Sequence, residues 1–480
     1  MGIGLSNWTL ANAVARRPGC LGTVSGTSLD QVVTRRLQLG DPGGHVRRAF
    51  AHFPCQATVA KVLKTYFIEG GKAPEARFRT PPMYSLTPPR DLNALIALCS
   101  FAEVWLAREG HNGPVGMNLL EKILLPNTAA AYGGMLAGVD YILMGAGIPH
   151  QMPGILDRLS NHEPVAIKVT REDDNESVDL HFDPRGIFEV EFPRLKRPHF
   201  LGIVTSPLIA LTILKRAKGP VAGFIVEGYT AGGHNAPPRG QLKLNEIGEP
   251  IYGDRDIPDM QKFQALGMPY WLAGGMGRPN QLAEALRSGA YGIQVGTAFA
   301  FCKDSGLDDS LRLPVLEKVK NGTAKVFTDP LASPTGFPFK VVELAGTMSE
   351  EDVYKSRDRV CDIGLLRHPY RKPDGSTGFR CPADDIGLYT KKGGAVEDTE
   401  HRKCICNGLL ATVGLGQVRS ANVSEIPIIT AGDDLTLLGA FLKEDTLHYS
   451  AHDVIDALQG GVKISPEGVA TLIEPAPVGS

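Results

Sequence analysis

The clearest signal in the sequence is a set of short apolar runs that end in glycine. Residues 221–226 (VAGFIV), 269–275 (PYWLAGG) and 291–297 (YGIQVGT) are rich in apolar and β-branched side chains. Runs of this length without polar alternation are typical of strands buried on both faces, as in a parallel sheet. Each run leads into a loop that contains glycine, and α/β enzymes place their chemistry in such loops.

Earlier parts of the chain repeat this pattern, with helical spacing between the runs. Strands are predicted at residues 20–25, 114–120 and 141–145. Residues 1–5 match the end of a first strand, so either this strand is shortened or the start of the gene is annotated late. The alternation of strands with helices predicts an α/β protein, and we expect a (β/α)₈ TIM barrel. The alternative interpretation is that the glycines only close tight turns.

Two segments compete for the fifth strand of this barrel, residues 165–170 (VAIKVT) and 201–205 (LGIVT). The second segment leads at once into a helical stretch, which is a strand-to-helix junction in the expected place. We therefore assign residues 201–205 to the barrel and predict an added hairpin over residues 165–182. Lys168, within that hairpin, is then structural rather than catalytic.

The predicted barrel covers residues 1–345 and contains a long insertion, at about residues 30–112, between its second and third strands. The insertion includes a long helical stretch for which Asp91 is the expected N-cap. At residues 346–480 the barrel-like alternation ends. We expect a C-terminal, mainly helical extension there.

Composition and charge limit the partners. The chain has 480 residues and a net charge of −2, so it lacks the basic footprint of a nucleic-acid-binding protein. No apolar run is long enough to span a membrane, and the N-terminus has no basic region ahead of an apolar core. We therefore expect a cytoplasmic protein without nucleic-acid or membrane partners. A homo-oligomer is compatible with the sequence.

His234 is the candidate catalytic residue. It follows the run at residues 221–226 in the loop AGGH, directly after Gly232 and Gly233. Glycines allow the backbone to approach a ligand closely, and a neutral imidazole with a pKa near 6.5 can take a proton from a carbon acid. The structural alternative is that His234 caps a loop through its ring nitrogens.

At these residues the chain resembles the nitronate monooxygenases, FMN-dependent enzymes formerly called 2-nitropropane dioxygenases. The resemblance covers about residues 1–345 and rests on residues 227–234, with AGGH after a strand, and on the later AGG and GT strand ends. FMN-dependent enoyl reductases of fatty-acid and polyketide synthesis share much of this pattern.

The resemblance implies an FMN cofactor and a set of contacts to it. Gly2 and Asn118 would face the flavin ring, although Asn118 could instead form an internal hydrogen bond to a neighbouring loop. The implied contacts along the ribityl chain and the phosphate are Gly232, Gly233, Gly274, Gly275, Gly296 and Thr297.

The implied reaction is the oxidation of a nitronate by molecular oxygen, with His234 assisting substrate binding and able to deprotonate a nitroalkane. The first alternative is an NAD(P)H-dependent enoyl reductase, whose acyl substrate would arrive on a carrier protein. The second is a non-catalytic barrel that serves as a binding or assembly subunit.

Half of the eight cysteines lie in the predicted extension, at Cys361, Cys381, Cys404 and Cys406. Four thiols could ligate zinc or an iron–sulfur cluster. Their spacing lacks the CxxC pairs that are typical of such sites, so ordinary reduced cysteines are the preferred interpretation. The sequence therefore assigns no metal.

Overall fold

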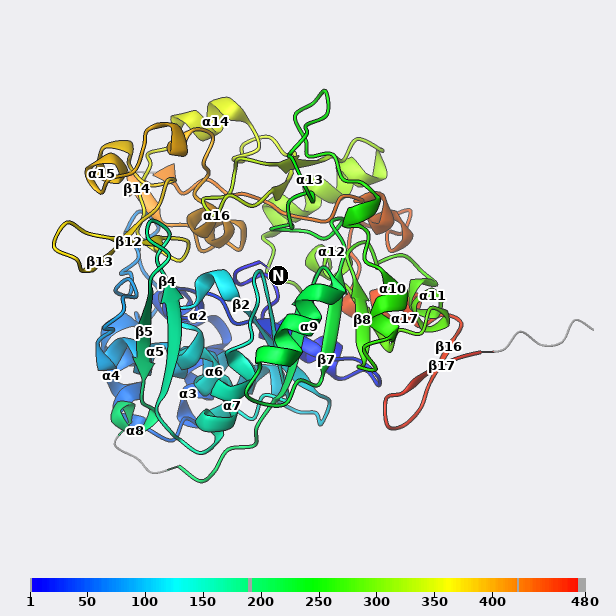
Figure 1. Cartoon of the computed structure of the whole chain (residues 1–480), viewed down its shortest axis with the longest axis horizontal. Helices are drawn as coiled ribbons and strands as arrows, with labels where there is room; N and C mark the ends of the chain where they lie inside the picture. The colour runs from blue at the N-terminus through cyan, green and yellow to red at the C-terminus, as the bar shows by residue number, and fades with distance from the viewer. Residues whose placement is uncertain (1, 189–191, 421–422, 474–480) are drawn as a thin grey trace, which may run out of the picture.

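The computed structural model describes residues 2–188, 192–420 and 423–473. Its centre is a curled, seven-stranded parallel sheet (Figure 1). In spatial order the strands are β1 (Gly22–Ser25), β2 (Val115–Leu120), β3 (Tyr141–Gly145), β6 (His199–Val204), β7 (Gly223–Glu227), β8 (Tyr270–Ala273) and β9 (Gly292–Gln294). The α/β class and the parallel sheet predicted from the apolar runs are confirmed.

Both faces of the sheet are buried, which explains why the strands lack polar alternation. Successive residues of a strand point to opposite faces. Ile142 and Phe200 join the large core that the sheet shares with the helices, whereas Leu143, Leu201 and Ile225 pack together on the other face. The parallel register aligns Ile142 with Phe200 and Leu143 with Leu201, so each face receives a matching layer.

Helices connect the strands of the sheet. The helices that precede β3 are α1 (Trp8–Ala15), α2 (Leu29–Gln38), α3 (His45–Ala51), α4 (Gln56–Tyr66), α5 (Arg90–Arg108) and α6 (Asn127–Leu136), with the short turns η1 (Pro42–Gly44) and η2 (Glu121–Ile123). Those that follow β3 are α7 (Met152–Ser160), α8 (Pro184–Ile187), α9 (Pro207–Arg216), η3 (Asp254–Asp256), α10 (Met260–Gln264), α11 (Gln281–Arg287), α12 (Thr297–Ala300) and α13 (Asp309–Lys320). Helices α2 to α5 all lie between β1 and β2 in the chain.

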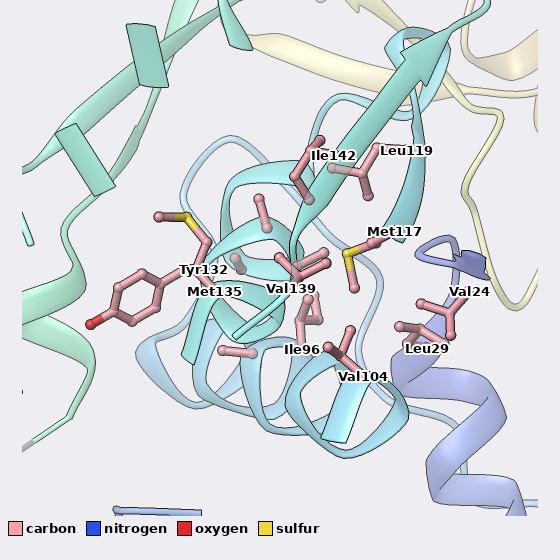
Figure 2. Close-up of a cluster of buried hydrophobic side chains, with 14 of the residues drawn as sticks. Val24, Leu29, Ile96, Val104, Met117, Leu119, Tyr132, Met135, Val139 and Ile142 are labelled. Atoms are coloured by element: carbon pink, nitrogen blue, oxygen red, sulfur yellow. The ribbon is translucent and has the colours of Figure 1, made fainter. Parts of the chain in front are cut away.

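The largest core forms where β2 and β3 pack on α5 and α6 (Figure 2). Met117 of β2, Ile142 of β3 and Val104 of α5 are fully buried there. A Cβ atom added at Gly134 of α6 would lie 3.3 Å from the Met117 Cε atom. The small residues of α6 therefore let this helix approach the sheet closely.

The prediction that Asp91 caps α5 is wrong. The helix begins at Arg90, so Pro89 occupies the N-cap position and Asp91 lies in the first turn. Asp91 forms an ion pair there with Lys61 of α4. A carboxylate in the first turn still stabilises the helix through the helix dipole.

The hairpin predicted over residues 165–182 is confirmed and lies outside the parallel sheet. Strands β4 (Val165–Thr170) and β5 (Ser177–Phe182) pair only with each other and are antiparallel, while β6 takes the place between β3 and β7. Lys168 is exposed and its Nζ atom lies 3.1 Å from the Asp179 carboxylate. Lys168 thus forms an exposed ion pair across the hairpin.

Residues 3–5, within the predicted end of a first strand, form a turn. Gly4 has a φ of 65°, a conformation that strands do not contain. The segment nevertheless lies beside β1, because the Ser25 N–H donates to the Ser6 carbonyl at 2.8 Å. The Gly306 N–H donates to the Leu5 carbonyl at 2.8 Å, which ties the same turn to the chain after α12.

The rest of the chain adds short helices and hairpins, which lie mainly over one end of the sheet (Figure 1). The strands are β10 (Val326–Asp329), β11 (Phe339–Val342), β12 (His368–Arg371), β13 (Thr377–Arg380), β14 (Val418–Ser420), β15 (Val423–Ser424), β16 (Val462–Ile464) and β17 (Ala470–Leu472), paired in sequence order as antiparallel hairpins. The helices are α14 (Glu351–Ser356), α15 (Ile386–Lys391), η4 (Glu397–Thr399), α16 (Ile405–Thr412), η5 (Thr436–Ala440) and α17 (Ala451–Leu458).

Replacing Ile142 with alanine should lower the free energy of unfolding by about 2–5 kcal/mol, because it removes buried methyl groups and leaves a cavity. The matched control is Leu208→Ala on α9, where the side chain is 73% exposed and the change should stay within about 0.5 kcal/mol. Denaturant unfolding of the two variants measures both effects. Equal losses at the two positions would contradict the burial of Ile142.

Candidate active site

A cavity of about 610 Å³ lies at the carboxyl ends of the parallel strands. Parallel strands all end at the same edge of the sheet, so the loops that follow them converge there. The cavity is lined by His234 and by every position that the resemblance implies for FMN, namely Gly2, Asn118, Gly232, Gly233, Gly274, Gly275, Gly296 and Thr297. The structure thus brings these nine residues to one place.

The glycines of the cavity are needed for different reasons. Gly274 and Gly275 have φ values of 87° and 72°, which residues with a side chain rarely adopt. A Cβ atom at Gly232 would lie 2.7 Å from the carbonyl carbon of Ala431, so packing fixes this position. A Cβ atom at Gly296 would meet no atom within 4 Å. Turn geometry therefore requires Gly274 and Gly275, packing requires Gly232, and Gly296 leaves open space for a ligand.

Asn118 is 5% exposed in β2 and lines the cavity. Its backbone carbonyl accepts a hydrogen bond from the Gly26 N–H at 2.8 Å. Its side-chain amide makes no hydrogen bond to another residue that the structure describes. The internal hydrogen bond considered from the sequence is thus not formed within the described ranges, and the amide can serve a ligand.

His234 is held by both its backbone and its ring. The loop that carries it forms an antiparallel bridge with Phe339 of β11, in which the Lys340 N–H donates to the Gly233 carbonyl at 3.0 Å. The imidazole packs edge-on against the Phe339 ring, with 4.9 Å between the ring centroids. Its Nε2 atom lies 2.6 Å from the Ser333 hydroxyl oxygen.

The pKa of His234 differs from the expectation. Burial, together with the positive charge of Lys122, lowers this pKa from 6.5 to about 3. The imidazole is therefore neutral at neutral pH, but it is a much weaker base than an ordinary histidine. In this state one ring nitrogen donates a hydrogen bond and the other accepts one.

Four charged residues that line the cavity are missing from the predicted site, namely Lys122, Glu227, Asp433 and Asp434, and the first two have strongly shifted pKa values. Glu227 ends β7, and burial raises its pKa to about 7. Lys122 lies in η2, directly after β2, and burial lowers its pKa to about 7. Both groups therefore change charge near neutral pH. The available signal was a charged residue at the end of an apolar run, which Glu227 follows directly and Lys122 follows after Glu121.

A segment from the C-terminal part of the chain closes one side of the cavity. The Thr430 hydroxyl accepts a hydrogen bond from the Gly233 N–H at 2.9 Å, and the Thr297 hydroxyl accepts one from the Gly432 N–H at 2.9 Å. Thr430 and Gly233 are 197 residues apart in the chain, so no local pattern could predict the contact.

Among the described residues, no three His, Cys, Asp or Glu side chains are placed to hold a single metal ion. Cys406 is the member of the cysteine group that lines the cavity. Over the same ranges, none of the helices combines the length and the apolar character required to cross a bilayer.

Residues 182–330 match the model of the family described as nitronate monooxygenase. A comparison with curated proteins finds no match. Solved structures that resemble the chain include a nitroalkane oxidase from Streptomyces ansochromogenes (15% identity, TM-score 0.43, 96% of this chain and 93% of that chain) and the enoyl reductase domain of MlnA from Bacillus amyloliquefaciens (12% identity, TM-score 0.39, 75% and 83%). FabK from Thermotoga maritima is 17% identical with a TM-score of 0.31, and the match spans 51% of this chain and 59% of that chain.

The wild-type protein should lose more stability at acid pH than a His234→Gln variant. The unfolded chain binds a proton at His234 below about pH 6.5, whereas the folded protein keeps the ring neutral down to about pH 3. Lowering the pH from 7 to 5 should therefore cost the wild type up to about 2 kcal/mol through this residue. Denaturant unfolding at both pH values tests this expectation, which equal losses in the two proteins would contradict.

Proposed function

We propose that the chain is an FMN-dependent oxidoreductase that oxidises alkyl nitronates with molecular oxygen. The observation that carries the proposal is the convergence of His234 and the glycine-rich strand ends on one cavity. Residues 182–330, which match the nitronate monooxygenase family, contain His234 and the glycines at the ends of β7, β8 and β9. The agreement between this match and the geometry supports an oxidoreductase.

We infer that the sheet is a variant of the (β/α)₈ barrel. Its seven parallel strands follow one another in sequence order around the curl, apart from the added hairpin. The turn near Gly4 lies between β1 and the chain that follows β9, where an eighth strand would close the barrel. In this interpretation α2 to α5 form the insertion, and residues 346–480 form an extension that supplies one wall of the cavity.

Several features of the cavity fit FMN. Its volume of about 610 Å³ is in the range of small-molecule and cofactor sites. The backbone N–H groups of Gly274, Gly275 and Gly296 donate to no other described residue, so they are available to a phosphate. The Gly233 N–H is instead engaged by Thr430, so Gly233 would provide space rather than a donor.

The protein would bind, orient and shield the reactants, and bound FMN would supply the electron-accepting chemistry. Asn118 would hold the ring edge through its amide, and the glycines after β8 and β9 would hold the phosphate. The side chains of Phe339 and Ala431 close the cavity on the His234 side. These side chains would limit the access of water to the position that the substrate would take.

The electrostatics of the cavity suit an anionic substrate. A nitronate arrives already deprotonated, so its oxidation needs no strong base, and neutral His234 can donate a hydrogen bond to it. Lys122, whose pKa is about 7, adds positive charge on the same side. For a neutral nitroalkane, Glu227 with a pKa of about 7 is a better proton acceptor than His234.

Replacing Gly296 with valine should weaken FMN binding by about tenfold or more, because the side chain would enter open space in the cavity. Gly253→Val is the matched control, since a Cβ atom at Gly253 also meets nothing within 4 Å and this residue does not line the cavity. Fluorescence titration with FMN measures both dissociation constants. The same change in both variants would contradict the assigned position of the cofactor.

Anaerobic stopped-flow absorbance tests the reaction itself. The protein reconstituted with FMN is mixed separately with propionate 3-nitronate and with NADPH. We expect the nitronate, and not NADPH, to change the flavin absorbance. His234→Gln should keep FMN and slow this change by about 10- to 100-fold.

The other outcomes of this experiment are equally informative. Fast bleaching by NADPH alone would overturn the proposal in favour of an enoyl reductase. A correctly folded protein that does not retain FMN would support a non-catalytic barrel.

A further inference from the structure

A second cavity, of about 430 Å³, lies beside the candidate active site. Three residues, Lys122, Ile123 and Leu365, line both cavities, so they form part of the wall between them. His234 and the glycines assigned to FMN do not line the second cavity. It is therefore a separate site, and its volume is within the range of small-molecule pockets.

The second cavity is built largely by segments that do not belong to the parallel sheet. Asp30 comes from α2, Leu92 and Ile96 from α5, Val169 from β4 and Phe379 from β13. Helices α2 and α5 lie between β1 and β2 in the chain, β4 belongs to the separate hairpin, and β13 lies in residues 346–480. More than half of the residues that line the cavity are apolar, so the body of a ligand there would be apolar too.

Two carboxyl groups, Asp30 and Glu121, line this apolar cavity. The stem of Glu121 packs on Gly147, where an added Cβ atom would lie 2.5 Å from the Glu121 Cγ atom. Gly147 lines the first cavity, whereas Glu121 lines only the second. The Glu121 carboxylate accepts no hydrogen bond from another described residue, and Asp30 accepts one from its neighbour Gln31 at 3.3 Å. Within the described ranges, neither carboxylate forms an ion pair.

Two cationic side chains of the second cavity are already engaged by the protein. The Lys168 Nζ atom lies 3.1 Å from the Asp179 carboxylate. The Arg367 guanidinium donates from Nε to the Gly364 carbonyl at 2.9 Å and from Nη2 to the Tyr84 carbonyl at 2.6 Å. These contacts leave the carboxyl groups, rather than these cations, in need of a partner.

The two remaining basic groups are also engaged. The Lys122 Nζ atom donates to the Thr335 hydroxyl at 3.4 Å, and its charge acts on His234 in the first cavity. The His150 Nδ1 atom lies 3.0 Å from the Ile148 carbonyl oxygen. Neither group pairs with Glu121 or Asp30.

The electrostatic cost of this arrangement falls on the carboxyl groups. Burial raises the pKa of Glu121 to about 7. Burial also raises the pKa of Asp30 to about 6, although hydrogen bonds from Gln31 and the charge of Arg35 oppose the shift. A carboxylate that is buried without a partner is costly, and a cation brought next to it removes part of that cost. The ring of Tyr84, which also lines the cavity, is a further group that can contact a cation.

We propose that the second cavity binds a small organic cation, a protonated primary amine with an apolar body, and that Glu121 holds its ammonium group. Asp30 adds a second negative charge to the same cavity, and the apolar walls contact the rest of the ligand. None of the residues assigned to FMN takes part. The amine site therefore does not rest on the proposed oxidation of nitronates.

Isothermal titration calorimetry of the full chain with three matched probes tests this proposal. The probes are n-hexylamine, 1-hexanol and hexanoate, at about pH 8, where Glu121 is mostly ionised and the amine is protonated. We expect hexylamine to bind at least about tenfold more tightly than hexanol, because only the amine can pair with the carboxylate. Equal binding of hexanol, tighter binding of hexanoate, or no binding of hexylamine would each overturn the proposal.

Single substitutions locate the bound amine. Glu121→Gln keeps the size of the side chain and should weaken hexylamine binding by about tenfold or more. Glu284→Gln is the matched control, because Glu284 is exposed on α11 and does not line either cavity. It should leave the affinity unchanged, and far-ultraviolet circular dichroism verifies that both variants fold.

A third variant separates the two cavities. Glu227 lines only the first cavity, so Glu227→Gln should leave hexylamine binding unchanged if the amine occupies the second. A loss of affinity in Glu227→Gln, together with an unchanged affinity in folded Glu121→Gln, would place the amine in the first cavity and overturn the proposal.

Discussion

The antiparallel bridge between the His234 loop and β11 is the interaction on which the candidate site depends. Two hydrogen bonds form it, from the Lys340 N–H to the Gly233 carbonyl and from the Asn235 N–H to the Pro338 carbonyl, both at 3.0 Å. The bridge places the imidazole against Phe339 and within reach of Ser333. Without it, the loop after β7 would lack a partner on one side and the histidine would be solvated.

This enclosure explains the electrostatics of the cavity. Burial is the largest cause of the pKa shifts of His234, Glu227 and Lys122, and each shift favours the neutral form. The part of the cavity around these three groups is poorly solvated, so the charge of a bound ligand would interact strongly with them. A bound anion would favour the charged form of Lys122 and raise its pKa back towards the ordinary value. We therefore expect anion binding to be coupled to proton uptake.

Local sequence patterns predicted the features that depend on local spacing. The apolar runs located the strands of the sheet, and the helical stretch directly after residues 201–205 separated β6 from the β4–β5 hairpin. The turn at Gly4 was missed because one positive φ cannot be read from a glycine alone. The contact of Thr430 with Gly233 and the low pKa of His234 were missed because both arise from tertiary packing. The strand ends of the site were therefore predictable, and its enclosure was not.

Residues 346–480 belong to the candidate site as much as the sheet does. Ala431 packs against Gly232, and Cys406 of α16 forms part of the cavity wall. The Asn407 side-chain amide of the same helix donates to the Val360 carbonyl at 3.2 Å, so a segment well before α16 in the chain helps to hold this wall of the cavity in place.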